Sequence, residues 1–477
     1  MSSAATSNLN ATTNGNSAPA FDWPLANEAE ALLRKYIDAF LQKNGFARKL
    51  AERMQTESAT DFFEWVDHLV LAPAEEKALQ AVGFTRDATV ETPDGEIVLE
   101  HARATLPRVL LRAGGKQNPS VIALRPEFVA DFIAAQNLSA EIEGEPLSRY
   151  RRVLIADENG ARLEGVERNA YRGFTSAPLK AGELQAIVKA RELWRTRQRQ
   201  FSEDAEGFRV ANKILSQSIS LVGRDRSCEF FFESERIYWE SRNRAAQIQK
   251  RRQDRLGLGW GNHDHHTFRS SRAHFVDLNE FLLKLGFAKR ERYYAGAEAG
   301  WGAQISEQSV VGIVVFADVD LMPEETQLDF STQPLPAVQK LGTVGLWTGL
   351  HGESFLEAGM HHLEARFDFN LLRDQLQSCG VNTMKPFSDF QFLRQAFTEG
   401  ERWPVNPARA KRLLEAGSIN AEQSEKFCRE GALGSHLENL QRHGGFKGFN
   451  QKSVSVVISA TDPRKNHFKL AGEPVAA

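Results

Sequence analysis

Residues 264–269 read DHHTFR, and they are followed by FVDLNEFL at 275–282 and LGF at 285–287. The same pattern returns as HHLEAR at 361–366, FNLLRDQL at 369–376 and CGV at 379–381. Each copy predicts a strand carrying His-x-x-x-Arg, then a short amphipathic helix, then a glycine turn into the next strand. The interval of 97 residues between His265 and His362 is too long for a solenoid repeat and is typical of a duplicated module.

Three further strands are predicted after the first helix, at residues 291–294, 300–306 and 310–318, so the first copy is a βαβββ unit. The run WVDHLVL at 65–71, with Gly83-Phe84 after it, looks like another module opening. The region around it is therefore a candidate for a degenerate third module. Along the chain we expect a disordered tail (1–20), an α+β region (21–181), a charged helical segment (182–255), two modules (256–335 and 336–465) and a C-terminal tail (466–477).

The composition is that of a folded protein whose sites are local. Of the 477 residues, 42% are hydrophobic and 25% are charged, and 59 basic against 62 acidic residues give a net charge of -3. This balance excludes a global basic field for nucleic acid and a global acidic field for cations. The basic stretch 236–255 is predicted to be a solvated face of a long helix, so nucleic-acid binding is not expected. The 31 Phe residues supply several cores or pockets that exclude water.

The sequence also bears on compartment and assembly. Three cysteines (Cys228, Cys379 and Cys428) are too few and too scattered for a disulfide framework or a cysteine-based zinc site. Residues 1–20 lack the basic start and apolar core of a secretory signal, and no apolar run is long enough for a membrane span. We therefore expect a cytoplasmic protein. Segment 182–255 either covers the outside of the sheet or makes a dimer contact. A homo-oligomer is therefore one of the two alternatives.

A βαβββ unit with histidine on its opening strand resembles the vicinal oxygen chelate superfamily. Residues 264–287 fit the usual opening closely, and the second unit differs by His361 in place of the aspartate. The run ENLQR at 438–442 and the glycine-rich segment after it are similar to the C-terminal part of 4-hydroxyphenylpyruvate dioxygenases. Two copies of His-x-x-x-Arg together with Glu-x-x-Gln-Arg are most similar to 2-oxoadipate dioxygenase/decarboxylases. The resemblance covers about residues 260 to 460.

This resemblance implies an α+β fold in which repeated βαβββ modules form a cupped mixed sheet around one divalent metal, beside a largely helical N-terminal region. The metal ligands would be His265, His362 and Glu438. Two imidazoles and one carboxylate with open positions form the facial triad suited to Fe(II) oxygenases. We therefore expect Fe(II), with Zn, Mn and Ni as alternatives, and dioxygen as co-substrate. The open positions leave room for a small 2-oxo acid to bind through its carboxylate and keto oxygens.

Two arginines are candidate substrate-binding residues. Successive side chains of a strand point to opposite faces, so Arg269, four residues after His265, projects to the same side as that histidine. Its guanidinium could hold a substrate carboxylate through two parallel hydrogen bonds. Arg366 has the same offset from His362 and is the second candidate.

Other residues have weaker signals. In the glycine-bearing run 444–455, Gln451 could orient a substrate oxygen, and Phe446 and Phe449 could form a lid; a tight turn into the next strand is the alternative. His68 is a second-choice first ligand, because no arginine lies four residues after it. His266 and His361 are expected to face away from their neighbours and to pack or to support the ligands.

Three functions remain on the sequence alone. The first is an Fe(II) dioxygenase that decarboxylates a 2-oxo acid oxidatively. The second keeps the metal as a Lewis acid in a lyase or isomerase of the same superfamily. The third is a non-catalytic binding protein that uses only the cupped sheet.

Overall fold

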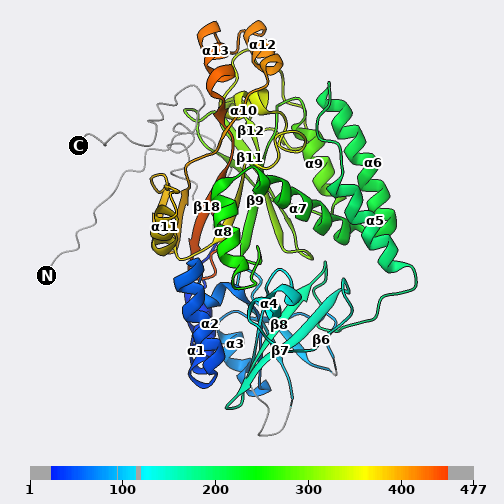
Figure 1. Ribbon diagram of the computed structural model, residues 1–477, viewed down its shortest axis with the longest axis vertical. Helices are drawn as coiled ribbons and strands as arrows, with labels where there is room; N and C mark the ends of the chain where they lie inside the picture. Colours follow the sequence, from blue (N-terminus) through cyan, green and yellow to red (C-terminus); the bar gives the residue numbers. More distant parts are fainter. Residues whose placement is uncertain (1–22, 94, 114–119, 450–477) are drawn as a thin grey trace, which may run out of the picture.

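The computed structural model describes residues 23–93, 95–113 and 120–449, which form two eight-stranded sheets with helices around them (Figure 1). The first sheet has the spatial order β2-β3-β4-β1-β5-β8-β7-β6. Its strands are β1 (Val66–Leu71), β2 (Thr85–Arg86), β3 (Ile97–Glu100), β4 (Arg108–Leu111), β5 (Ser120–Leu124), β6 (Ile142–Glu143), β7 (Tyr150–Glu158) and β8 (Ala161–Arg168).

The second sheet has the matching order β10-β11-β12-β9-β13-β18-β15-β14. Its strands are β9 (His263–Arg269), β10 (Ala288–Tyr294), β11 (Trp301–Gln308), β12 (Ile313–Asp320), β13 (His362–Arg366), β14 (Ser388–Phe390), β15 (Leu393–Phe397) and β18 (His436–Arg442). A separate ribbon pairs β16 (Arg402–Trp403) with β17 (Ala432–Leu433).

The thirteen α-helices of the described residues are α1 (Asn27–Lys43), α2 (Gly45–Arg53), α3 (Glu76–Ala81), α4 (Val129–Ala135), α5 (Glu183–Arg195), α6 (Asp204–Val222), α7 (Arg224–Ser241), α8 (Arg244–Asp254), α9 (Phe275–Lys284), α10 (Thr343–His351), α11 (Phe369–Ser378), α12 (Pro407–Glu415) and α13 (Ala421–Glu430). None of them combines the length and apolarity needed to cross a membrane.

The sheets have the same internal plan. In the second sheet β9 runs parallel to β12 and antiparallel to β13, and β13 runs parallel to β18. In the first sheet β1 runs parallel to β4 and antiparallel to β5, and β5 runs parallel to β8. Each sheet therefore joins two βαβββ units side by side at its centre. The predicted α+β fold with repeated βαβββ modules in a mixed sheet is confirmed by this strand order.

Residues 66–168 contain two βαβββ units, where the sequence had suggested one degenerate module. Two strands of this sheet, β2 and β6, have only two residues each, too few to produce an alternating pattern. The second unit there, which opens at β5, also lacks the histidine that marked the other openings. The predicted tails at 1–20 and 466–477 lie outside the described residues.

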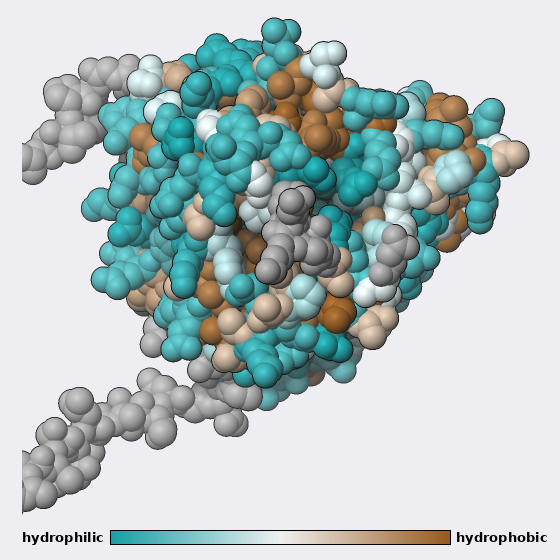
Figure 2. All heavy atoms as spheres, turned by 90° about the horizontal axis from the view of Figure 1, so that it is seen from below, coloured by the Kyte–Doolittle hydropathy of each residue, from teal (hydrophilic) through white to brown (hydrophobic). Residues whose placement is uncertain are grey.

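Two main cores hold these layers together. Helix α1 buries Leu33, Ile37 and Phe40, which recur at helical spacing, in the core of the first sheet. In the second core, helices α5, α6 and α7 lie along the second sheet (Figure 1), and Phe231 and Phe232 of α7 pack against Phe268 of β9. The charged segment 182–255 thus covers the sheet with its apolar face. Figure 2 views the molecule from the first-sheet end, where hydrophobic side chains occur in separate patches among hydrophilic ones.

Candidate metal centre

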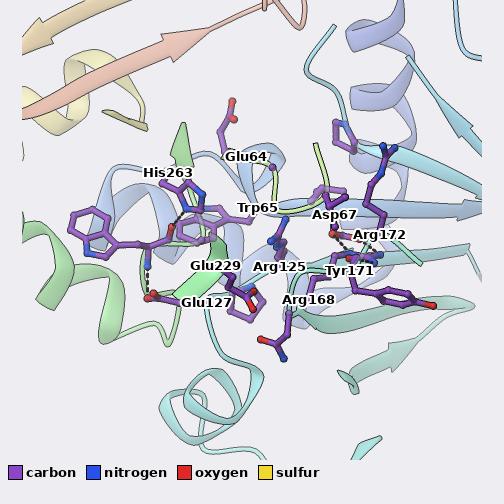
Figure 3. Close-up of a pocket in the computed structure, with 18 of the residues that line it drawn as sticks. Glu64, Trp65, Asp67, Arg125, Glu127, Arg168, Tyr171, Arg172, Glu229 and His263 are labelled. Carbon is purple, nitrogen blue, oxygen red and sulfur yellow. Dashed lines mark hydrogen bonds and ion pairs between the residues drawn. The ribbon is translucent and has the colours of Figure 1, made fainter. Parts of the chain in front are cut away.

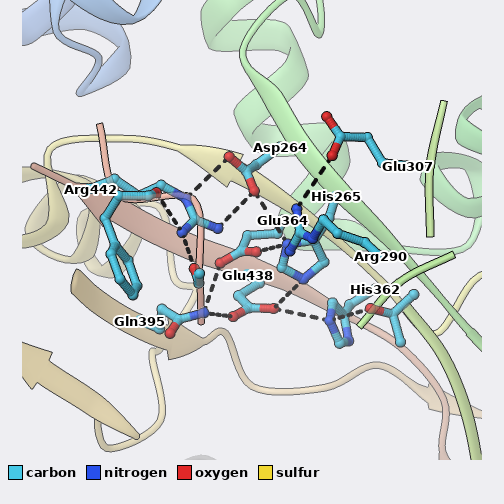
Figure 4. A network of polar contacts seen from close by, with 12 residues as sticks. Asp264, His265, Arg290, Glu307, His362, Glu364, Gln395, Glu438 and Arg442 are labelled. Carbon is cyan, nitrogen blue, oxygen red and sulfur yellow. Dashed lines mark hydrogen bonds and ion pairs between the residues drawn. The ribbon is translucent and has the colours of Figure 1, made fainter. Parts of the chain in front are cut away.

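The three central strands of the second sheet bring His265, His362 and Glu438 together. In the antiparallel pair β9–β13, Glu364 lies opposite His265, and in the parallel pair β13–β18 it lies beside Glu438. Because side chains alternate along a strand, the three predicted ligands project from one face into one cavity (Figure 4). One potential ligand atom from each lies within 4.8 Å of the others, and all three residues are buried.

In each of the three candidate ligands, one side-chain atom points toward the common centre and another is held by a neighbouring residue. His362 Nε2 lies 3.0 Å from Glu438 Oε2, and His265 Nε2 lies 3.9 Å from the same oxygen. On the outer side, His265 Nδ1 contacts the Glu364 carboxylate, and His362 Nδ1 lies 2.9 Å from His361 Nδ1. A partner on the far ring nitrogen fixes the orientation of a metal-binding imidazole.

Gln395 of β15 completes this outer layer. Its Nε2 donates to Glu438 Oε1 at 3.1 Å and to Glu364 Oε1 at 3.0 Å. Glu438 is therefore held by one oxygen while the other faces the two imidazoles. The donor set fits a divalent metal, because three buried, pre-oriented donors of the kinds that bind Fe(II), Zn(II) or Mn(II) meet at one point.

The electrostatics also suit a cation. Burial lowers the pKa of His265 well below its ordinary value and lowers that of His362 to about 3, so both imidazoles are neutral, as metal ligands must be. Burial raises the pKa of Glu438 well above its ordinary value, because a carboxylate is costly in this enclosed place without a nearby positive charge. A divalent cation would supply that charge.

A second group of potential ligands, Asp264, His265 and Glu364, also has ligand atoms within 4.8 Å of one another. It shares His265 with the first group. Its Asp264 already forms a two-point ion pair with Arg442, at 3.0 and 3.3 Å. Burial alone would raise the pKa of Asp264, but the charge and hydrogen bonds of Arg442, together with other positive charges nearby, outweigh it and hold that pKa below its usual range. We therefore take His265, His362 and Glu438 as the candidate ligands.

Arg269 lies where the alternation predicts. It lines the same cavity as the trio, it is only 3% exposed, and its guanidinium carbon lies 5.5 Å from the centre of the Trp347 ring. Asp318 of β12 is its register partner and faces the same cavity. Burial raises the pKa of Asp318 to about 7, partly offset by the Arg269 charge. The cavity thus holds one cationic and one acidic group beside the candidate ligands.

Arg366, the second predicted clamp, lies elsewhere. It is the last residue of β13, and its guanidinium pairs with Glu64 of the first-sheet half at 3.0 Å. It does not line the cavity of the trio, so the structure gives no support to a substrate clamp at Arg366. Gln451 lies outside the described residues. Phe449 does line the cavity, against Phe316, with ring centres 5.1 Å apart.

The two adjacent histidines differ from each other. His266 faces away from the cavity, as expected, and packs edge-on against Phe232. His361 precedes β13, so strand alternation does not apply to it, and it lines the cavity beside His362. His361 contacts Nδ1 of His362, just as carboxylates contact Nδ1 of His265. The expectation that His361 faces the opposite side is wrong, whereas its expected supporting role fits this contact.

His68 lies in the first sheet. The strands around it have the same pairing as those of the metal centre, but they lack a counterpart of His362. His68 and Glu164 hold the register positions of His265 and Glu438, but Val121 stands at the position of His362 and Ala123 at that of Glu364. Neither side chain can ligate a metal. Among the described residues, no candidate group of metal ligands includes His68. The structure therefore gives no support to His68 as the first ligand.

The repeat extends to an arginine in each sheet. Arg442 lies four residues after Glu438, pairs with Asp264 and donates to the Gly448 carbonyl oxygen. Arg168 lies four residues after Glu164, pairs with Asp67 at 2.7 and 2.8 Å and donates to the Gly173 carbonyl oxygen. A phenylalanine follows each glycine, Phe449 in the metal cavity and Phe174 against His68, with ring centres 4.9 Å apart. The two sheets are thus structural repeats of each other.

Sequence reasoning missed Glu364 and Gln395. Glu364 lies two residues after His362, so the alternation that placed Arg269 would also have found it. Gln395 carries no such signal, because β15 is joined to the ligand strand only through the pairing of the folded sheet.

No family model and no curated protein matches the chain. Among solved structures it is similar to a putative glyoxalase superfamily protein from Ralstonia eutropha JMP134, with 11% identity, a TM-score of 0.34 and coverage of 55% of this chain and 95% of that one. It is similar to a mutant of 4-hydroxymandelate synthase from Streptomyces coelicolor, with 13% identity, a TM-score of 0.28 and coverage of 86% and 100%. Methylmalonyl-CoA epimerase from Mycobacterium tuberculosis has 13% identity, a TM-score of 0.22 and coverage of 38% and 88%. At these values the likeness carries no argument about activity, and the fold assignment rests on the strand order described above.

Proposed function

We propose that this protein is a mononuclear non-haem Fe(II) dioxygenase that acts on a 2-oxo acid with oxidative decarboxylation, in the manner of 2-oxoadipate dioxygenase/decarboxylases. The observation that carries the proposal is the convergence of His265, His362 and Glu438, each held from outside, in a cavity that also contains Arg269. Fe(II) bound there would supply open coordination positions for the 2-oxo acid and for dioxygen.

The other residues of the cavity have supporting roles in this proposal. Arg269 receives a carboxylate of the substrate, because a buried guanidinium binds a carboxylate through charge-assisted hydrogen bonds. Phe316, Phe397 and Phe449 form apolar walls that exclude water from the reacting atoms. The cavity volume is about 60 Å³, well below that of pockets for drug-sized ligands, and it favours a small substrate.

The test is oxygen uptake by the Fe(II)-reconstituted full-length protein with 2-oxoadipate and with 4-hydroxyphenylpyruvate. We expect uptake coupled to CO₂ release, and faster with 2-oxoadipate. Arg269→Gln should raise KM for the acid by at least about tenfold, the size expected for a lost charge-assisted hydrogen bond. Arg366→Gln, at the matching offset from the second histidine, is the control and should leave KM unchanged. An iron-loaded protein that consumes no oxygen with any 2-oxo acid of a broad panel would exclude the proposal.

A second candidate keeps the metal but not dioxygen. Asp318 faces the cavity across from Arg269, and its pKa of about 7 suits a group that takes up and returns a proton. Such a group favours a lyase or isomerase with Zn, Mn or Ni as a Lewis acid. That enzyme would exchange a substrate C–H proton with D₂O without consuming oxygen, and Asp318→Asn would abolish the exchange. A non-catalytic protein would bind no metal at the trio.

A further inference from the structure

A second and larger pocket, of about 330 Å³, lies between the two sheets (Figure 3). Its walls are residues at the ends of β1, β5 and β8, the middle of α7, and the glycine-rich segment before β9. It has no residue in common with the cavity of the metal centre. This pocket is not used by the proposed function, and its volume is in the range of small-molecule sites.

Arginines outnumber acidic residues in this pocket by only seven to six, and most of the arginines have acidic partners. Seven arginines line it. Four of these form close ion pairs, which are Arg168–Asp67 at 2.7 Å, Arg191–Glu233 at 2.7 Å, Arg366–Glu64 at 3.0 Å and the short pair Arg172–Glu100. The remaining three are Arg108, Arg125 and Arg236.

Arg125 lines the pocket without an ion-pair partner among the described residues. Its backbone N–H donates to the Trp65 carbonyl oxygen at 2.8 Å, but within the part of the chain that the structure describes its guanidinium makes no hydrogen bond or ion pair. In Figure 3 it lies between Trp65 and Asp67, and no interaction line reaches it. Asp67 is already engaged on both oxygens by Arg168. The half-buried Arg125 guanidinium thus lines the pocket without a counter-charge, which an anionic ligand would supply.

Other polar atoms around the pocket are also left over. In the described residues Trp65 Nε1, Arg236 Nε and Glu229 Oε2 are buried without a hydrogen-bond partner. The carboxylate nearest to Arg236 is that of Glu127, whose oxygen is 3.9 Å away, beyond hydrogen-bond distance. Buried polar atoms are nearly always paired, so several orphans around one pocket indicate a missing ligand. Two of these three orphans are donors, which again favours an acceptor-rich anion.

The glycine-rich segment 257–261 shapes this pocket. A Cβ at Gly261 would lie 2.5 Å from the Arg125 carbonyl oxygen and 2.9 Å from Trp65, and one at Gly259 would meet the Glu127 side chain at 2.3 Å. Only glycine allows this segment to pack so closely against residues 125–127. The segment therefore fixes the backbone that carries Arg125 and forms one rigid wall.

We propose that this inter-sheet pocket binds a small organic oxyanion, a carboxylate or a phosphate ester, whose charged group is held by Arg125 and Arg236. Its carbon skeleton would pack against the aromatic walls formed by Phe63, Phe128 and Phe230. Arg236 belongs to the basic stretch that the sequence predicts as solvated, but it is only 9% exposed and faces this pocket.

The test is calorimetric titration of the full-length protein with phenyl phosphate, benzoate and inorganic phosphate. We expect saturable one-site binding of at least one aromatic probe, and the tighter of the two identifies the charged group as phosphate or carboxylate. Arg125→Gln should weaken that binding at least tenfold. Arg162→Gln, which removes an exposed arginine on β8 paired with Asp157, is the charge-matched control and should bind as the wild type does.

The design separates this site from the metal centre and from misfolding. His265→Ala should leave probe binding unchanged, so a failure of the proposed dioxygenase activity would not affect the result. Because the Arg125 guanidinium has no partner among the described residues, Arg125→Gln should melt no lower than the wild type. Arg236→Gln provides a second test of the same site. The proposal is overturned if the wild type binds neither aromatic probe at millimolar concentration, or if both arginine variants bind as well as the wild type.

Discussion

The two buried arginine–aspartate pairs allow the roles of the two sheets to be compared within one chain. Replacing Arg442 by Met removes its two-point pair with Asp264 and its hydrogen bonds to the carbonyl oxygens of Phe446 and Gly448. Replacing Arg168 by Met removes the matching pair with Asp67 in the first sheet. Both variants leave a buried carboxylate without its counter-charge.

The size of the effect follows from burial. Removing one member of a buried ion pair lowers the free energy of unfolding by about 3 to 5 kcal/mol. The side chains of Arg168 and Asp67 are 3% and 5% exposed, whereas those of Arg442 and Asp264 are 10% and 13% exposed. We therefore expect Arg168→Met near the upper end of this range and Arg442→Met near the lower end.

For iron affinity at the proposed metal centre we expect the reverse order, with the larger loss in Arg442→Met. Asp264 lies beside His265 Nδ1 at 3.4 Å, and Arg442 also anchors the segment that brings Phe449 to the cavity. Arg442→Met should therefore weaken iron binding about 10- to 100-fold, as is typical when an outer partner of a ligand is lost. Arg168→Met should leave iron affinity unchanged, although it destabilises the protein more.

Urea unfolding gives the stability of each variant, and competition with a chelator gives its iron affinity, both at a temperature where the variants remain folded. The reasoning is refuted if Arg442→Met costs less than about 1 kcal/mol, which is the value of an exposed pair. It is also refuted if Arg168→Met weakens iron binding as much as Arg442→Met does.

Three further predictions concern single residues. Glu364→Gln should weaken iron binding about 10- to 100-fold, because its carboxylate holds His265 Nδ1; the chelator competition measures this, and an unchanged affinity would count against the outer-layer role. Burial raises the pKa of Glu229 to about 7, so between pH 4.5 and 7 the folded protein keeps a proton that the unfolded chain releases, and stability falls as pH rises. Glu229→Gln should remove this pH dependence. At pH 8 its free energy of unfolding should exceed that of the wild type by about 1 to 2 kcal/mol, a figure reduced for solvent screening. Equal urea midpoints of the two proteins at pH 8 would contradict this. Burial lowers the pKa of His351 to about 3, so the free energy of unfolding falls as pH drops below 6.5. His351→Gln should reduce the slope of this free energy against pH by up to about 1.4 kcal/mol per pH unit. Equal slopes for the variant and the wild type would argue against this.

Much of the second sheet could be predicted from the sequence, because its signals are local. The repeated His-x-x-x-Arg pattern located β9 and β13, and the alternation of side chains placed Arg269 in the cavity. The Glu438 motif located the third strand, which pairs with β13 in the folded sheet. In these cases the spacing along the chain alone determines which side chains share a face.

The rest depended on contacts between distant parts of the chain. Arg366 has the same offset as Arg269, but the packing of the two sheets brings Glu64 to it. The first sheet was hard to recognise because β2 and β6 are so short and because Val121 replaces the second histidine. The pocket around Arg125 could not be predicted either, because its walls come from both sheets and from α7.

The most direct test of the metal centre is the iron stoichiometry of anaerobically purified protein. We predict one Fe(II) per chain in the wild type, almost none in His265→Ala and His362→Ala, and one in His68→Ala, which removes the corresponding histidine of the first sheet. Full iron in both His265→Ala and His362→Ala, or loss of iron in His68→Ala alone, would contradict the assignment.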